Sequence, residues 1–136
     1  MSFFNVLGVA GSGMHAQMVR MNTISSNLAN VGVAASSAEE AYKAKRPIFR
    51  TVMDQTTETF AAGVSVESIG NSDKPNDRRF EPNHPMADAD GNIYISNVNS
   101  IEEMVEMTVA SRSYQNNVES INTAKKLVLQ TLRLGQ

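Results

Sequence analysis

Apolar side chains in the N-terminal stretch recur at the spacing of a helix that lies along another helix. Leu7, Met14, Met21 and Leu28 follow one another at intervals of seven residues. A second row lies three residues further on and consists of Ala10, Gln17, Ile24 and Val31. This heptad spacing predicts a helix over residues 4–30 with one face turned toward a partner helix.

The C-terminal stretch carries the same pattern over a greater length. One row consists of Met104, Ser111, Val118, Lys125 and Leu132, and the other of Met107, Tyr114, Ile121 and Val128. Asn99 stands where a helix cap is expected, with Glu102 three residues later as its capping-box partner. We therefore expect a helix over residues 100–133, ~50 Å long at ~1.5 Å per residue.

The stretch between the two helices favours short β-strands. Strand patterns cover residues 47–53, 63–69 and 92–96, which together predict one small sheet. Residues 32–46 are typical of a mobile linker, and residues 70–77 of a long turn. The pattern predicts an α+β, mainly α fold: an N-terminal helix (1–31), a linker with a small β-rich insert (32–98) and a C-terminal helix (99–136), the two helices packed as a coiled-coil-like pair. The pair could close on itself within one chain or engage neighbouring chains.

Composition removes several classes of function. The chain of 136 residues has no cysteine and a formal net charge of -2, so disulfides, thiolate sites and a basic nucleic-acid-binding surface are not expected. No apolar run approaches the ~20 residues that span a membrane. The first residues lack the basic flank of a cleaved signal peptide. If the protein leaves the cytoplasm, we expect export without such cleavage.

Few residues could carry chemistry, and none forms a complete motif. Asp88-Ala89-Asp90-Gly91 resembles part of a calcium loop, but Met86 and Asn97 occupy two of the ligand positions, so a turn before a strand is the better interpretation. His15 and His84 have no accompanying metal-ligand pattern. We expect no catalytic residues, no metal and no cofactor, and hence no enzyme.

Residues 21–30 are rich in asparagine and serine, which are poor choices for a helix interior. One explanation is a fraying helix end. The other, which we favour, is a packed interface in which short amides form hydrogen bonds across the contact and set its register. Asn22, Asn27 and Asn30 are the candidate residues.

The same segment resembles the N-terminal signature of flagellar rod, hook and hook-associated proteins. The matching residues are Ser25-Ser26-Asn27-Leu28-Ala29-Asn30. Residues 81–91, 97–99, 102–105, 110–119 and 123–126 are similar to the proximal rod proteins of that family. The chain departs from the family pattern at Val31-Gly32-Val33-Ala34, which replaces the T-x-G-Y turn of many axial proteins. This difference affects only what is expected of the loop that follows.

The resemblance implies a structural subunit of the flagellar basal-body rod, located in the periplasm-spanning rod. Such subunits leave the cytoplasm through the type III export apparatus and polymerise helically through their terminal helices, forming part of the drive shaft and of the export-channel wall. The implied partners are further copies of the chain, other rod proteins and the membrane-ring/export-gate adaptor, without nucleic acid or membrane insertion. The residues that we expect at subunit interfaces are Leu7, Met14, Met21, Asn22, Ile24, Asn27, Leu28, Asn30, Met104, Met107, Tyr114, Val118, Ile121, Val128 and Leu132.

Two other functions fit parts of the pattern. A different type III-secreted helical polymer, such as a needle subunit, would explain the helices, but those chains usually lack a β insert. A small metal-binding module would explain the aspartates near Gly91 and would be revealed by a calorimetric calcium titration.

Overall fold

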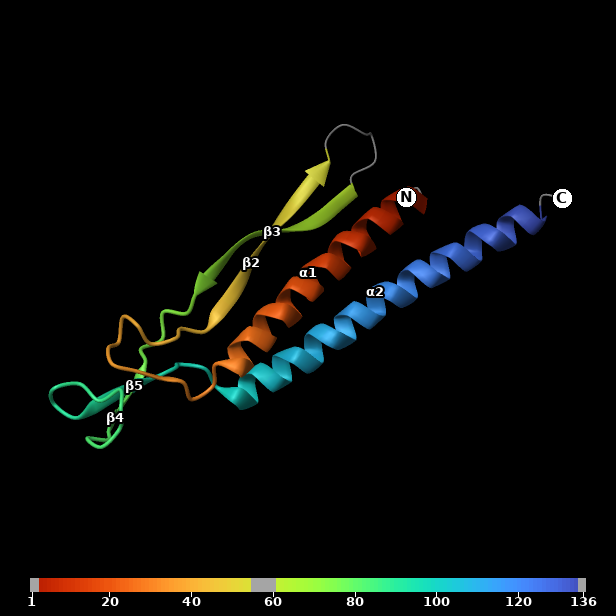
Figure 1. Ribbon diagram of the computed structural model, residues 1–136. Helices are drawn as coiled ribbons and strands as arrows, with labels where there is room; N and C mark the ends of the chain where they lie inside the picture. The colour runs from red at the N-terminus through yellow and green to blue at the C-terminus, as the bar shows by residue number, and fades with distance from the viewer. Residues whose placement is uncertain (1–2, 55–60, 135–136) are drawn as a thin grey trace.

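Two long helices and two small antiparallel sheets make up the protein. The computed structural model describes residues 3–54 and 61–134, so residues 1–2, 55–60 and 135–136 of the predicted regions lie outside the described residues. Helix α1 spans Phe3–Ala29 and helix α2 spans Ser100–Leu134. The helices run antiparallel, side by side, with both chain ends at the same end of the molecule (Figure 1). None of the described helices is long and apolar enough to cross a membrane.

The register of the helix pair follows from two contacts. Asn27 on α1 donates a hydrogen bond to Glu103 on α2, and a Cβ on Gly13 would lie 2.9 Å from Asn117 Nδ2. Both pairs fit one antiparallel register. The helices meet closely here because a glycine faces a short amide side chain.

The inner face of α2 differs by one position from the predicted rows. The buried and half-buried positions of this face recur at alternating steps of four and three residues. They are Glu103, Met107, Ala110, Tyr114, Asn117, Ile121, Ala124 and Val128. The row that begins at Met107 is therefore placed as predicted. The row that begins at Met104 lies beside this face, because small and polar side chains occupy the contact and the larger apolar ones flank it. Knobs-into-holes packing of a coiled coil stays a prediction.

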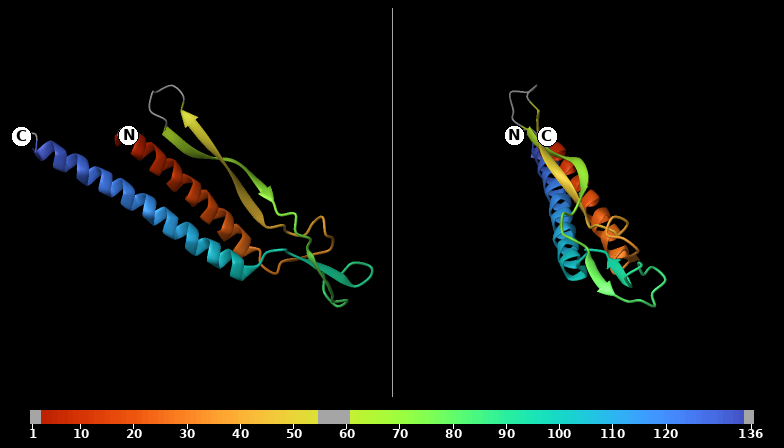
Figure 2. Two further views of the ribbon diagram at one scale, coloured as in Figure 1. Left: turned by 180° about the vertical axis from the view of Figure 1, so that it is seen from behind. Right: turned by 90° about the vertical axis from the view of Figure 1, so that its left-hand side faces the viewer.

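A long hairpin lies along α1 (Figures 1 and 2). Its strands are β2 (Lys45–Asp54) and β3 (Ala61–Asn71), which pair antiparallel with one irregularity between Ile48 and Phe49. Ser12 Oγ on α1 accepts a hydrogen bond from the Val64 backbone N–H at 3.2 Å. The Arg20 guanidinium lies 5.0 Å from the centroid of the Phe49 ring. These contacts hold the hairpin against the first helix.

A second sheet lies at the end of the molecule away from the two chain termini (Figure 1). Its strand order is β1-β5-β4. The strands are β1 (Ala34–Ala35), β4 (Asp77–Phe80) and β5 (Asn92–Ile95). The prediction of a single sheet was therefore wrong. Residues 32–46, predicted as a linker, contribute β1 and the start of β2, because their backbone groups pair with distant segments. Strand β4 was missed because its residues Asp77, Arg78, Arg79 and Phe80 are polar or exposed on both faces.

The aspartates before β5 form a turn, as the sequence predicts. Asp88 Oδ1 accepts hydrogen bonds from the backbone N–H groups of Asp90 and Asn92, at 3.0 and 2.8 Å. Gly91 has a φ of 79°, which glycine adopts without strain. Across residues 3–54 and 61–134, no three histidine, aspartate or glutamate side chains converge as metal ligands.

Substitution of Gly91 tests how tightly this turn is packed. Gly91→Ala places a Cβ 2.9 Å from the Phe80 ring and 3.1 Å from Pro82 Cβ, in addition to left-handed backbone strain. We expect a loss of roughly 2 to 4 kcal/mol in the free energy of unfolding, measured by urea denaturation. Gly32→Ala is the matched control, because Gly32 also has a positive φ but no atom within 4 Å of its Cβ position. Gly32→Ala should lower the free energy of unfolding by about 1 kcal/mol. Equal losses in the two variants would contradict the packing account.

Candidate assembly interface

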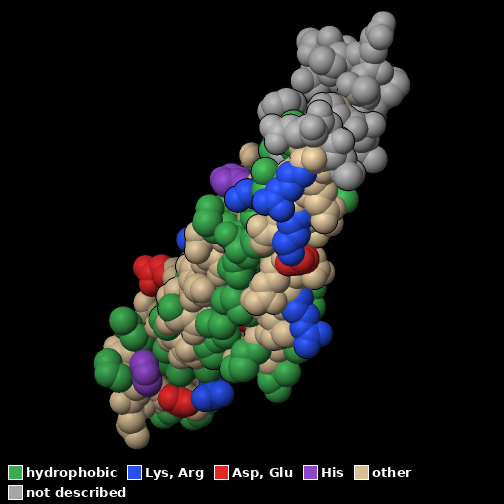
Figure 3. Space-filling model, turned by 90° about the vertical axis from the view of Figure 1, so that its right-hand side faces the viewer, with side chains coloured by type: hydrophobic (Ala, Val, Ile, Leu, Met, Phe, Trp, Pro, Cys, Tyr) green, Lys and Arg blue, Asp and Glu red, His purple; other side chains and the backbone are tan. Residues whose placement is uncertain are grey.

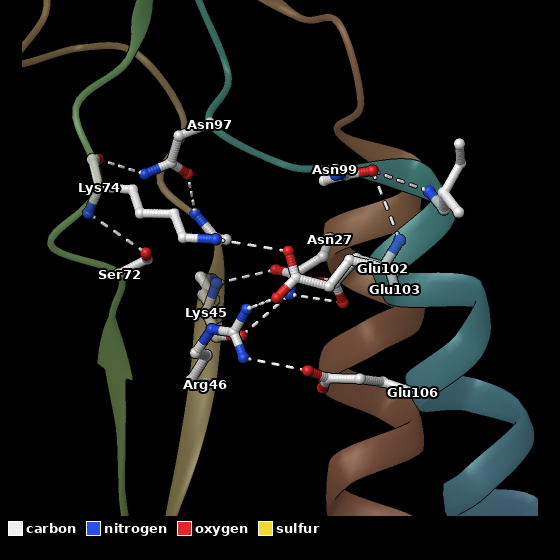
Figure 4. Close-up of polar contacts among 12 residues, drawn as sticks. Asn27, Lys45, Arg46, Ser72, Lys74, Asn97, Asn99, Glu102, Glu103 and Glu106 are labelled. Carbon is white, nitrogen blue, oxygen red and sulfur yellow. Dashed lines mark hydrogen bonds and ion pairs between the residues drawn. The ribbon is translucent and has the colours of Figure 1, made fainter.

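A buried asparagine ties the two helices to the hairpin. The side chain of Asn27 is 1% exposed. Its Nδ2 donates hydrogen bonds to the Lys45 carbonyl at 2.9 Å and to Glu103 Oε2 at 3.1 Å. Its Oδ1 accepts hydrogen bonds from the Lys45 backbone N–H at 2.8 Å and from the Tyr42 hydroxyl at 3.0 Å. All four hydrogen-bonding positions of the amide are therefore used, and Figure 4 shows the contacts with Lys45 and Glu103.

The geometry explains why an asparagine is needed at this position. Its amide meets both the N–H and the C=O of Lys45, as a neighbouring strand's peptide group would, so α1 provides a pairing partner for the first residue of β2. The remaining N–H of the amide reaches the carboxylate of Glu103, which is 2% exposed. A buried carboxylate is costly unless hydrogen bonds satisfy it. Asn27 thus joins α1, α2 and β2 in one contact.

Charged side chains surround this junction on its outer side. Arg46 at the start of β2 forms ion pairs with Glu102 and Glu106 on α2, both at 3.1 Å, and Lys74 approaches Glu102 at 3.4 Å. Hydrogen bonds from Arg46 and then from Lys74 lower the pKa of Glu102 below its ordinary value. Burial acts to lower the pKa of Arg46, but the two glutamates outweigh it and the pKa is raised. The α2 acids therefore anchor the hairpin.

Amide side chains connect the three-stranded sheet to the same region. Asn97 Oδ1 accepts a hydrogen bond from the Ala44 backbone N–H, and its Nδ2 donates to the Lys74 carbonyl, both at 2.6 Å. Asn76 Nδ2 donates to the carbonyls of Tyr42 and Ile95. The loops on either side of the junction are thus held by side chains that imitate backbone pairing.

The cap of α2 is partly as predicted. Asn99 Oδ1 accepts hydrogen bonds from the backbone N–H groups of Ile101 and Glu102, at 3.0 and 3.4 Å. Glu102, predicted to complete a capping box, instead turns outward to Arg46 and Lys74. Two cations attract this carboxylate more strongly than the single N–H of the cap residue does.

The three candidate asparagines have different environments. Asn27 is fully engaged within the chain, and Asn30 donates to the Ser26 carbonyl at 2.7 Å near the end of α1. Asn22 is exposed. The structure thus assigns Asn27 an internal role, and an intersubunit role for the three stays a prediction.

The exposed side of α2 near the junction carries an apolar stripe. We define the outer stripe as Ile101, Met104, Val105 and Val109, whose spacing places them on neighbouring rows of one helix face. All four are more than half exposed, and Ile101 is 72% exposed. Val105 and Val109 also line a groove of about 340 Å³ together with Arg20 and Arg46. Such an aliphatic row on a small protein marks a candidate interaction surface.

A second apolar surface lies on the flank of the helix pair opposite the hairpin. At ~100° per residue, the half-buried Leu7, Met14, Met21 and Leu28 fall on the side of α1 away from Ser12 and the other hairpin contacts. The same flank of α2 carries Met104 and Val118. Hydrophobic side chains form a band along the length of the molecule in Figure 3. Six of the predicted interface residues, the four of α1 together with Met104 and Val118, thus lie beside the inner contact, and their intersubunit role stays a prediction.

Sequence reasoning missed several residues of this region. Tyr42, Lys45 and Arg46 were assigned to a linker, and Ala110 was not singled out although it is fully buried. A usable signal existed for the outer stripe, since Ile101, Val105 and Val109 recur every four residues.

Removal of the Asn27 amide should destabilise the whole junction. Asn27→Ala leaves four polar groups of Lys45, Tyr42 and Glu103 without this partner, so we expect a loss of about 3 kcal/mol in the free energy of unfolding. Asn22→Ala, on the same helix but exposed, should change it by less than about 0.5 kcal/mol. Thermal and urea unfolding measure both. A similar, small effect in the two variants would contradict the proposed role of Asn27.

The lowered pKa of Glu102 predicts a pH dependence. Because the folded-state pKa lies below the ordinary value of 4.5, the stabilisation is complete above that pH and is lost as the pH falls through the folded-state pKa. Glu102→Gln should therefore be less stable than the wild type at neutral pH, and the difference should disappear in acid. Urea unfolding over a pH series measures this. Glu119→Gln, at an exposed position of α2, is the control; a constant deficit of Glu102→Gln at every pH would contradict the ion-pair account.

Comparisons with known proteins show what the chain is similar to. Residues 7–34 match a family described as "Flagella basal body rod protein", and residues 89–134 match "Flagellar basal body rod FlgEFG protein C-terminal". The chain is 40% identical to the flagellar basal-body rod protein FlgC of Salmonella typhimurium and 41% identical to that of Yersinia enterocolitica, over the whole of each chain. It is 38% identical to FlgC of Buchnera aphidicola subsp. Schizaphis graminum, again over full length. The chain therefore belongs to the FlgC family of flagellar basal-body rod proteins.

Proposed function

We propose that this structural rod subunit polymerises helically through α1 and α2, and that the polymer forms part of the drive shaft and of the export-channel wall. The observation that carries the proposal is the arrangement of apolar surface. The inner faces of the two helices are closed against each other, whereas the outer stripe and the flank opposite the hairpin remain exposed or half-buried.

The energetics favour contacts made on several sides at once. Full burial of an aliphatic side chain contributes ~1.5–3 kcal/mol, whereas association costs an estimated 4–15 kcal/mol in lost freedom of motion. The four side chains of the outer stripe alone would barely offset that cost. A lattice in which both surfaces of each subunit are covered would exceed it.

One side of α1 carries no charged residue, which also supports the packing of that side against a neighbouring subunit. Arg20 is the only charged residue of α1, and it lies toward the hairpin over Phe49. The opposite side presents methionine, leucine and small polar residues. Methionine adapts to contacts of imperfect shape, which suits a subunit whose neighbours are related helically.

The remaining parts of the proposal follow from family membership. We infer that the neighbours include other rod proteins and the membrane-ring/export-gate adaptor as well as further copies of the chain. We also infer that the subunit reaches the rod through the type III export apparatus without a cleaved signal peptide. No step of catalysis is proposed.

Charge placed in the outer stripe should block assembly but not folding. In Ile101→Asp/Val105→Asp, both substituted side chains point into solvent, and the aspartate that replaces Ile101 lies in the first turn of α2, where acids are favourable. We expect the variant to fold like the wild type by circular dichroism, yet to be absent from purified basal bodies and unable to restore motility in a strain lacking the wild-type subunit.

The control carries the same added charge on the exposed surface of the hairpin. Thr51→Glu/Ser68→Glu lies outside both the outer stripe and the flank opposite the hairpin, and should be incorporated normally. Normal incorporation of the stripe variant, or equal loss of both variants, would contradict the proposed role of this face.

A further inference from the structure

The C-terminal end of α2 extends beyond the helix that it packs against. In the register set by Asn27 with Glu103 and Gly13 with Asn117, the start of α1 at Phe3 lies opposite residues near 127. The last two turns of α2 therefore have no partner on α1, and Figure 1 shows α2 projecting past the N-terminal end of α1. We call residues 125–133 the overhang; they comprise this end of α2 and the residues just before it, which lie opposite the first residues of α1.

The overhang is both apolar and basic. Leu127, Leu129 and Leu132 are 58%, 47% and 64% exposed. Lys125, Lys126 and Arg133 are exposed as well, and no acidic residue occurs between positions 120 and 134. Figure 3 shows lysine and arginine side chains gathered along one side of the hydrophobic band. A surface of this composition fits a partner that is acidic and offers apolar side chains of its own.

The opposite end of the molecule has that composition. Residues 31–44 and 71–99, which form the three-stranded sheet and its loops, contain seven acidic and four basic residues. Residues 107–134 of α2 contain one acidic and four basic residues. The acidic end also exposes large apolar side chains, among them Phe80 at 68% and Met86 at 49%. We call this region the sheet end; its acidic residues are Glu39, Glu40, Asp73, Asp77, Glu81, Asp88 and Asp90.

We propose that the overhang of one subunit docks on the sheet end of a second copy. The proposal rests on the assembly function above and deepens it by naming the partner face. The contact joins two different surfaces of the chain, so it is heterologous and can repeat along a helical assembly. Opposite charges favour this head-to-tail arrangement, whereas contacts between like ends would bring like charges together.

Two variants with the same change in net charge test the proposal. Lys125→Glu/Lys126→Glu reverses charge on the overhang, and Arg78→Glu/Arg79→Glu reverses it on the sheet end, making that end still more acidic. At low ionic strength, sedimentation velocity of the full chain should show an association constant about tenfold weaker for the first variant. The second variant should associate at least as well as the wild type, and salt should weaken the wild-type association.

A rescue experiment identifies the partner face. Mixing Lys125→Glu/Lys126→Glu with Glu39→Lys/Glu40→Lys should restore association, because the reversed overhang then meets a reversed sheet end. Absence of self-association by the wild type, equal weakening by both charge reversals, or failure of the rescue would overturn the proposal. None of these outcomes removes the assembly role of the outer stripe, which is tested separately by Ile101→Asp/Val105→Asp in basal bodies.

Discussion

The buried amide of Asn27 forms hydrogen bonds with both α2 and the hairpin and so holds three elements in one register. Both helices and the hairpin are amphipathic elements with little apolar core of their own, and the fully buried positions are mostly small side chains. A register for three such elements must therefore come from specific polar contacts. Asn27 supplies it by pairing with the backbone of Lys45 and with the carboxylate of Glu103. Arg46 reinforces the same junction through Glu102 and Glu106.

This arrangement separates folding from assembly. Because the polar junction and small side chains hold the helices together, the larger apolar residues are free to lie on the outside. Met104, Val105 and the leucines of the overhang are exposed for this reason. A subunit built in this way can remain folded while presenting surfaces for neighbours on several sides, as a structural subunit of the flagellar rod requires.

The sequence was sufficient for the features that depend on local pattern. The heptad rows predicted both helices, and the Ser25–Asn30 signature indicated the family. The sequence was insufficient where the partner is distant. Asn27 meets Lys45 and Glu103 across 18 and 76 positions of the chain, so its pattern suggested an intersubunit contact. The inner row of α2 was misplaced because Glu103, Ala110 and Asn117 are charged, small or polar, and do not stand out in a search for apolar residues.

We expect α1 and α2 to pair within each subunit and this pair to persist in the assembled rod. The chain has no cysteine, so an engineered pair can report on it directly. Gly13→Cys and Asn117→Cys place two thiols across the helix contact. After mild oxidation of assembled rods and non-reducing denaturing electrophoresis, we expect a disulfide within one chain, seen as a monomer of altered mobility. A ladder of disulfide-linked dimers and larger species would contradict it, because the helices would then pair between chains.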